Sequence, residues 1–163
     1  MNEQIRSRDY LKEHGYCVET VEKQVIFPAI DKVTKRPILD AKGNPKNIYS
    51  KKDAFGCIDL IAVSDNFPGT LYVQTTSYSN MFARIKKCLA VPEMKTILKS
   101  HNRIHVHGWR KVPEGKRERW RLRVVELYLD DFGDVEQRVL MDEAKAEQEP
   151  LLPATETLFD LNF

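Results

Sequence analysis

Two apolar runs joined by a short turn constrain the fold of this chain of 163 residues more than any other feature. The stretch FGCIDLIAVSDNFPGTLYVQTTS reads as two strands, 55–64 and 70–76, with a Pro-Gly turn between them. So short a connection predicts an antiparallel hairpin. Each run carries one polar residue, Asp59 in the first and Gln74 in the second. Because burying either side chain unpaired is costly, the two residues must satisfy each other and the backbone, or share a third group such as a metal ion.

The rest of the chain alternates between helical and extended patterns. Strands on both sides of a central helical region predict an α/β fold with a mixed central sheet flanked by helices. We expect a core domain over 1–134 and an acidic, partly flexible tail over 135–163. The expected elements are a helix over 2–14 ended by Gly15, a strand over 16–26, a basic irregular loop over 27–53, helices over 80–90 and 92–100, and strands over 103–112 and 119–129.

Charge is distributed unevenly along the chain. Residues 135–163 hold seven acidic and two basic residues, a net of −5, so the overall net of +2 leaves +7 on residues 1–134. A basic body favours an anionic partner. No apolar run approaches the ~20 residues that span a bilayer, so we expect no membrane partner. Three widely spaced cysteines are typical of a reducing compartment, and we expect a cytoplasmic protein.

The apolar hairpin resembles the core of the PD-(D/E)xK nuclease superfamily, which has the restriction-endonuclease-like fold. The similarity is greatest to the small Holliday-junction-resolvase-like proteins of phages and prophages, and it extends from Met1 to about Glu126. It includes HVHGWRKV and RWRLRVVEL as closing strands. The resemblance implies a metal-binding Asp on the second core strand and a Glu-x-Lys motif on the third. An acid from the first helix or strand completes the site.

Carried over to this sequence, the motif assigns Asp59 to the strand-two aspartate and Gln74 to the glutamate position. Thr76 stands where the lysine would be. Glu22 is the expected upstream acid, with Glu19 as the alternative. The resemblance therefore implies that Asp59, Gln74 and Glu22 hold Mg²⁺, or Mn²⁺ in its place.

This sequence departs from the family pattern in two ways. Gln74 offers a neutral carbonyl oxygen in place of a carboxylate, and the motif lysine is missing. Some family members supply the cation from the following helix, where Arg84 and Lys87 lie three residues apart and share a face. Asp53, in KKDAFG, could position a metal-bound water or simply cap a loop. The chain is thus either a working nuclease with a displaced cation or a site that has lost part of its chemistry.

Basic residues in the loop and in the closing strands predict a surface that follows phosphates, although a solvated charged face is the usual explanation of such runs. Two hydroxyl side chains at the end of the second strand could also bind phosphate. The expected DNA-binding residues are Lys42, Lys46, Lys51, Lys52, Thr76, Ser77, Arg110, Lys111, Arg119 and Arg121.

Two functions are consistent with these features. The first is a Mg²⁺-dependent DNA endonuclease acting on branched or otherwise structured DNA, with a homodimer as a candidate assembly because a junction presents two equivalent strands. The second is a degenerate nuclease fold that binds DNA or a host protein without catalysis, such as an inhibitor of host defence.

Two further motifs leave alternatives open. His105 and His107 could bind zinc, contact a phosphate or pack in the core. The C-terminal TETLFDLNF either docks on its own domain or, by its Leu-Phe pair, resembles sliding-clamp-binding peptides of bacterial replication proteins.

Overall fold

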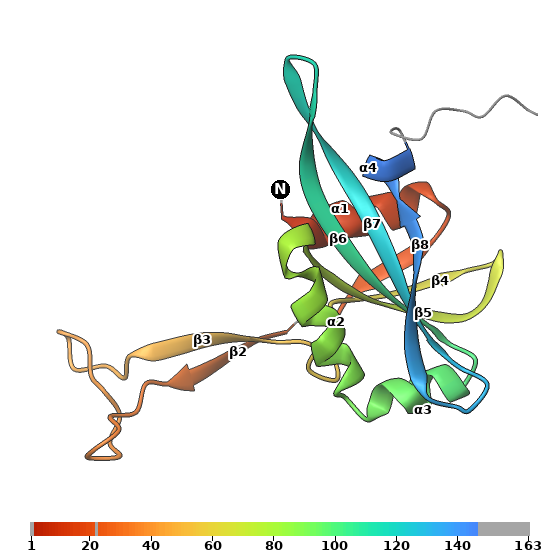
Figure 1. Ribbon diagram of the computed structural model, residues 1–163. Helices are drawn as coiled ribbons and strands as arrows, with labels where there is room; N and C mark the ends of the chain where they lie inside the picture. The colour runs from red at the N-terminus through yellow and green to blue at the C-terminus, as the bar shows by residue number, and fades with distance from the viewer. Residues whose placement is uncertain (1, 22, 147–163) are drawn as a thin grey trace, which may run out of the picture.

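A computed structural model describes residues 2–21 and 23–146 of the chain. Three helices and six strands form the main body, and two further strands form a separate ribbon (Figure 1). In chain order the elements are α1 (Glu3–Glu13), β1 (Cys17–Thr20), β2 (Lys23–Pro28), β3 (Asn47–Lys52), β4 (Leu60–Ser64), β5 (Phe67–Ser77), the 3₁₀ turn η1 (Tyr78–Asn80), α2 (Met81–Leu89), α3 (Glu93–Lys99), β6 (Arg103–Glu114), β7 (Arg117–Leu129), β8 (Val135–Asp142) and the single turn α4 (Glu143–Ala146).

Local signals fix both ends of α1. The Oδ1 atom of Asn2 accepts the backbone N–H of Ile5 at 2.9 Å, which caps the first turn. Gly15 follows the last turn with a φ of 79°, a conformation that favours glycine and ends the helix. The predicted helix and its terminator are therefore confirmed. No helix among the described residues is long and apolar enough to cross a bilayer.

The main sheet is mixed and has the strand order β1-β4-β5-β6-β7-β8. Strands β5 and β6 run parallel, and every other neighbouring pair runs antiparallel. The antiparallel pairing of β4 with β5 confirms the predicted hairpin. The parallel step from β5 to β6 requires a crossover, which α2 and α3 provide (Figure 1).

Alternating side chains bury both faces of the sheet. On one face, Leu11 of α1 packs against apolar residues of β4 and β5. On the other face, α2 and α3 pack against β6 and β7. The first cluster contains Leu60, Ala62, Leu71 and Val73, and the second contains Ile85, Cys88, Met94, Ile97, Ile104, Val106, Val125 and Leu127. The sheet therefore lies between helices, and the mixed α/β class follows the prediction.

The expected boundary at residue 134 falls inside the sheet. Residues 135–142, assigned to the tail by their charge, form β8 and pair with β7 as an edge strand. Most side chains of β8 are exposed, so its sequence lacks the apolar alternation that identifies a half-buried strand. Residues 147–163, with the Leu-Phe ending, lie outside the described residues.

The expected strand over 16–26 divides in two, and the expected irregular loop over 27–53 contains regular structure. β1 joins the main sheet, whereas β2 turns away and pairs with β3 in an antiparallel ribbon. Figure 1 shows this ribbon projecting far from the body. The loop prediction was therefore wrong in its secondary structure, because β3 and the bridges at the tip of the ribbon order the segment.

Candidate functional site

Asp59 and Gln74, the polar residues of the two apolar runs, lie side by side. Asp59 comes directly before β4, and its backbone N–H donates to the carbonyl of Val73 on β5 at 3.0 Å. This bond sets Asp59 next to Gln74, the following residue of β5. Both side chains are buried, with 8% exposure for Asp59 and 2% for Gln74. The two side chains therefore meet, as the hairpin pattern predicts.

The carboxylate of Asp59 completes hydrogen bonding at the end of the sheet. Its Oδ2 atom accepts three hydrogen bonds of 2.7 Å, from Nε2 of Gln74 and from the backbone N–H and Oγ1 of Thr75. Because β4 begins only at Leu60, Thr75 lies beyond the paired part of β4, and the carboxylate takes the place of a strand partner for its N–H. Nε2 of Gln74 also donates to the Thr75 carbonyl at 2.8 Å.

Two amide side chains beside this cluster keep buried polar atoms without partners. Oε1 of Gln74 is a buried acceptor with no hydrogen bond, and Nε2 of Gln4 is a buried donor with none. A buried polar group left unpaired costs about 1–3 kcal/mol. Since both residues line one cavity, a ligand offering a positive or donor group to Gln74 would remove part of this cost.

The cavity beside Asp59 has a volume of about 350 Å³ and opens between the start of α1 and α2. Polar side chains from four segments of the chain converge on it: the first turn of α1, the loop before β4, the middle of β5, and α2. The lining residues are Asn2, Glu3, Gln4, Asp53, Asp59, Gln74, Thr75 and Arg84. An acid-rich hollow that also holds one arginine can bind a cation and a phosphate together.

The two cations expected from α2 both lie at or near this cavity. Arg84 lines the cavity directly. Lys87 lies one turn further along α2, and its Nζ is 3.6 Å from Oδ2 of Asp53, which also lines the cavity. The helix therefore directs positive charge toward the carboxylates.

Of the two expected upstream acids, the structure describes only Glu19. Glu22 lies outside the described residues. Glu19, the alternative, is exposed on β1 and lines a different hollow with Ile61. Glu3 and Asp53 line the cavity instead. Glu3, at the start of α1, is a cavity residue that sequence reasoning missed.

The donor chemistry of the cavity suits Mg²⁺. Its acidic and amide side chains, Glu3, Asp53, Asp59 and Gln74, offer hard oxygen atoms, which Mg²⁺ prefers, and the unpaired Oε1 of Gln74 is one of them. Within the described residues, however, no three His, Cys, Asp or Glu side chains gather closely enough to hold a metal ion. A bound Mg²⁺ would therefore keep several water ligands or draw side chains inward.

The expected DNA-binding residues of the basic loop lie on the ribbon. Lys42, Lys46 and Lys52 are exposed there, and Lys51 belongs to β3, with a side chain outside the described set. Ser77 and Thr76 end β5. Ser77 is half-buried, with its Oγ 3.1 Å from Oγ of Ser79. Thr76 is 7% exposed, so its side chain is not on the surface that a phosphate would contact.

The expected DNA-binding residues of β6 and β7 are tied to acids. Lys111 pairs with Glu118 at 2.8 Å, and Arg119 pairs with Glu114 at 2.9 Å. Arg110 stacks over the ring of Tyr78 at 4.3 Å and lies 3.7 Å from Asp142, and Arg121 is half-buried. The positive charge of this hairpin is thus partly neutralised within the protein.

His105 and His107 point to the α1 face of the sheet, where they line a mainly apolar hollow with Tyr10. Burial lowers the pKa of His105 to about 4 and that of His107 to about 3, with smaller contributions from Arg103 and from His105 respectively. Both are therefore neutral near pH 7. Glu126 lies 4.0 Å from His105, but no three His, Cys, Asp or Glu side chains among the described residues are arranged to hold a metal ion, which favours packing over zinc binding.

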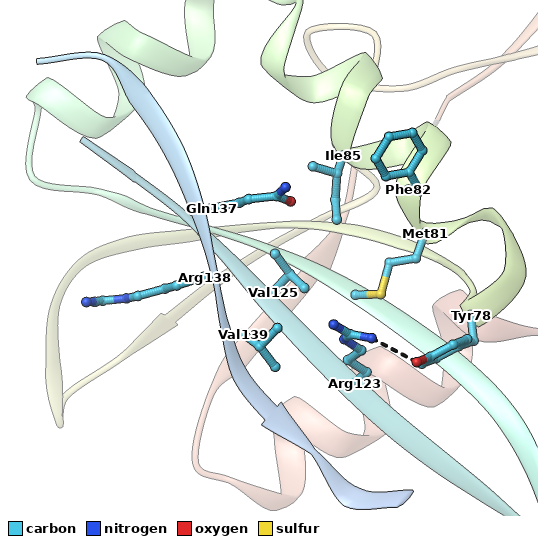
Figure 2. Close-up of a pocket in the computed structure, with 9 residues that line it drawn as sticks. All are labelled: Tyr78, Met81, Phe82, Ile85, Arg123, Val125, Gln137, Arg138 and Val139. Carbon is cyan, nitrogen blue, oxygen red and sulfur yellow. Dashed lines mark hydrogen bonds between the residues drawn. The ribbon is translucent and has the colours of Figure 1, made fainter. Parts of the chain in front are cut away.

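A second cavity, of about 410 Å³, lies between α2 and the β7–β8 edge (Figure 2). Apolar side chains of α2, including Phe82 and Ile85, face Val125 across it, while Arg123 donates to the hydroxyl of Tyr78 at 2.8 Å. Among the described residues no acid lines this cavity, in contrast to the cavity beside Asp59.

The chain matches no protein-family model, no curated protein and no solved structure. Its function is therefore inferred from its own residues and their geometry.

Proposed function

We propose that this protein is a Mg²⁺-dependent DNA endonuclease that acts on branched or otherwise structured DNA. The observation that carries the proposal is the contact between Asp59 and Gln74 in a cavity that Glu3, Asp53 and Arg84 also line. Acids and a cation around one hollow are the groups that phosphodiester hydrolysis requires.

The sheet topology supports a restriction-endonuclease-like core. β1, β4 and β5 are consecutive strands of the main sheet, and β5 runs parallel to β6 after a helical crossover. Asp59 comes at the start of the second of these strands and Gln74 lies on the third, the positions that the family motif assigns to its metal-binding residues. Helices on both faces agree with the same core.

The acids, the amide of Gln74 and the cations at the cavity have distinct roles in this proposal. Asp59 and Gln74 would hold Mg²⁺, with Glu3 or Asp53 as a further oxygen ligand. Bound Mg²⁺ polarises the phosphate and lowers the pKa of a coordinated water. Arg84 lies where it can balance charge that develops on the phosphate, and Lys87 orients Asp53.

A non-catalytic function is the second candidate, and a specific observation favours it. Oδ2 of Asp59 is already used by three donors, and the described residues contain no three-acid cluster. In that case the same fold binds DNA or a host protein, and Asp59 serves only to close the end of the sheet.

Cleavage assays on four-way junctions, flapped DNA and duplex DNA separate the two functions. We expect cleavage that needs Mg²⁺ or Mn²⁺. Its rate should fall at least about 100-fold in Asp59→Asn, because losing a metal ligand should cost no less than losing a residue that only supports a ligand. Asp65→Asn is the matched control, because Asp65 is exposed in the β4–β5 turn. Wild-type protein that cleaves none of these substrates, or Asp59→Asn that cleaves normally, would contradict the nuclease proposal.

A further inference from the structure

Most described side chains are exposed in the ribbon formed by β2, β3 and the segment 29–46 between them, which we call the ribbon arm. Figure 1 shows it extending away from the main sheet. Two-stranded ribbons are only marginally stable in water without packing partners. The tip is nevertheless tied together, since Ile38 donates to the Ala29 carbonyl at 2.7 Å and Lys46 donates to the Ile38 carbonyl at 2.8 Å.

Both faces of the ribbon arm present apolar side chains to solvent. Ile26 lies opposite Tyr49, and Phe27 lies opposite Ile48, so the two pairs occupy opposite faces. All four side chains are more than half exposed. A ribbon with apolar groups on both faces fits an environment that surrounds it, such as a groove, better than it fits a single flat surface.

The positive charges of the ribbon arm are available to a partner. Segment 29–46 holds five basic and two acidic residues, a net of +3. None of the arm's exposed cations has an ion pair with another described residue, in contrast to the paired cations of the β6–β7 hairpin. The exposed cations are Lys32, Lys35, Arg36, Lys42, Lys46 and Lys52.

The two acids of the segment are used to build its turns. Oδ1 of Asp31 accepts the backbone N–H of Val33 at 3.0 Å and that of Thr34 at 2.7 Å. Oδ1 of Asp40 accepts the backbone N–H of Lys42 at 2.8 Å. The bonds from Thr34 contribute most to lowering the pKa of Asp31, and a further bond from the backbone N–H of Asn44 at 2.9 Å contributes most to lowering that of Asp40.

The turn stapled by Asp31 presents Val33, which is 88% exposed. Lys32 and Lys35 flank this apolar side chain in the sequence. An apolar residue held on a capped turn between cations has no partner to pack on in the monomer. Side chains of this kind serve as wedges between base steps when basic residues hold the neighbouring phosphates.

We propose that the ribbon arm is the protein's grip on duplex DNA: it enters a groove, its unpaired cations follow the phosphates, and Val33 wedges against the bases. A DNA groove admits a two-stranded ribbon. This inference rests on the proposed function for its choice of DNA as partner. A second copy of the chain is a poorer occupant, because two arms of net positive charge repel each other.

Binding in EDTA tests the arm without requiring catalysis. Fluorescence anisotropy with a labelled four-way junction and a duplex gives Kd between about 50 and 200 mM salt, and the slope of log Kd against log salt counts phosphate contacts. We expect K42Q/K46Q to lower that slope by about 2, because each lost phosphate contact lowers it by about 0.9. The matched variant K95Q/R138Q, whose charges pair with Asp134 and Glu126 and which lies outside the expected DNA-binding residues, should change the slope much less.

The wedge has its own readout. With 2-aminopurine beside the bound step, we expect fluorescence to rise on binding of the wild type and of the control Val139→Ser, and to stay low with Val33→Ser. Val33→Ser should keep the salt slope, since no cation is lost. Both side chains are exposed, so both variants should fold.

Three outcomes would overturn the arm proposal: an unchanged slope in K42Q/K46Q, an equal loss of slope in K95Q/R138Q, or a wild-type dimer in sedimentation velocity that Phe27→Ser dissociates without changing the slope. The last result would assign the arm to a second copy. If the wild type does not cleave in Mg²⁺ but K42Q/K46Q lowers the salt slope, only the nuclease proposal is refuted. If the wild type cleaves but K42Q/K46Q leaves the slope unchanged, only the arm proposal is refuted.

Discussion

Nε2 of Gln74 lies 2.7 Å from Oδ2 of Asp59, inside a cavity that the first turn of α1 and the middle of α2 complete. This contact explains why each apolar run tolerates one polar residue. The carboxylate of Asp59 accepts hydrogen bonds just before β4 begins, and the amide of Gln74 donates one of them. The same contact leaves Oε1 of Gln74 unpaired at the cavity wall. Oδ2 of Asp59 thus serves the fold, while Oε1 of Gln74 stays available to a ligand. This arrangement suits a site that binds a cation reversibly.

Gln74→Glu should make the free energy of unfolding depend on Mg²⁺. Replacing the amide donor by a carboxylate puts two negative groups within 2.7 Å, where the wild type has a hydrogen bond. Without metal we expect a loss of about 1–3 kcal/mol in the free energy of unfolding. Mg²⁺ should recover it, because a ligand that binds only the folded state stabilises it in proportion to the logarithm of its concentration.

Thermal and urea unfolding with and without Mg²⁺ measure this effect. Gln137→Glu is the control, because Gln137 is an exposed residue of β8. If the stability of Gln74→Glu is the same with and without Mg²⁺, a cation site at this position is contradicted.

Arg84→Gln should slow cleavage while leaving the fold intact. Arg84 lines the cavity from α2 and is only half-buried. Removing a group that balances charge in the transition state costs about 10²–10³ in kcat. Lys86→Gln, on an exposed position of the same helix, should cleave at the wild-type rate. Single-turnover kinetics on the preferred substrate make the comparison, and equal rates for the two variants would remove Arg84 from the mechanism.

Stability should fall in mild acid because of His105 and His107. Burial lowers the pKa of His105 to about 4 and that of His107 to about 3. Glu126, which lies 4.0 Å from His105, is itself paired with Arg138 at 2.7 Å. The unfolded chain therefore takes up protons below about pH 6.5 that the folded protein does not bind. The stabilisation is complete above that pH and is lost as the pH falls toward the folded values.

At pH 5 this linkage amounts to about 2 kcal/mol for each histidine, relative to pH 8. Urea unfolding at both pH values measures it. His107→Gln should reduce the pH dependence by about half, and His14→Gln, on an exposed residue, should not. A wild-type stability that is flat from pH 8 to pH 5 would show that the histidines are not buried as described.

Ser7→Ala should loosen the attachment of α1 to the sheet. The buried Ser7 hydroxyl accepts the indole N–H of Trp109 at 2.8 Å. Without that acceptor the buried indole is left unpaired, and we expect a loss of about 1–3 kcal/mol in the free energy of unfolding. Ser79→Ala, at an exposed hydroxyl, should cost much less. Equal stability of the two variants in urea would contradict the importance of this bond.

The hairpin and its two polar residues are predictable because the information is local. Strand alternation and a short turn fix the pairing of β4 with β5, and so bring Asp59 beside Gln74. Helical spacing likewise puts Arg84 and Lys87 on one side of α2. The contribution of Glu3 depends instead on where Leu11 anchors α1 to the sheet, a long-range contact that no local pattern encodes.

The ribbon and the edge strand escape prediction for a related reason. β8 exposes most of its side chains, so its charged sequence resembles that of a tail although its backbone pairs with β7. The ribbon arm lacks a core, and its prolines and glycine favour a loop reading, while its bridges are fixed by the turns that Asp31 and Asp40 cap.

A crystal soaked with Mn²⁺ tests the central claim most directly through its anomalous difference map. We expect a peak in the cavity with metal–oxygen distances of about 2.1 Å to Asp59 and to Oε1 of Gln74. A map with no peak beside Asp59, from crystals in saturating Mn²⁺, would contradict the metal site and leave Asp59 with a structural role alone.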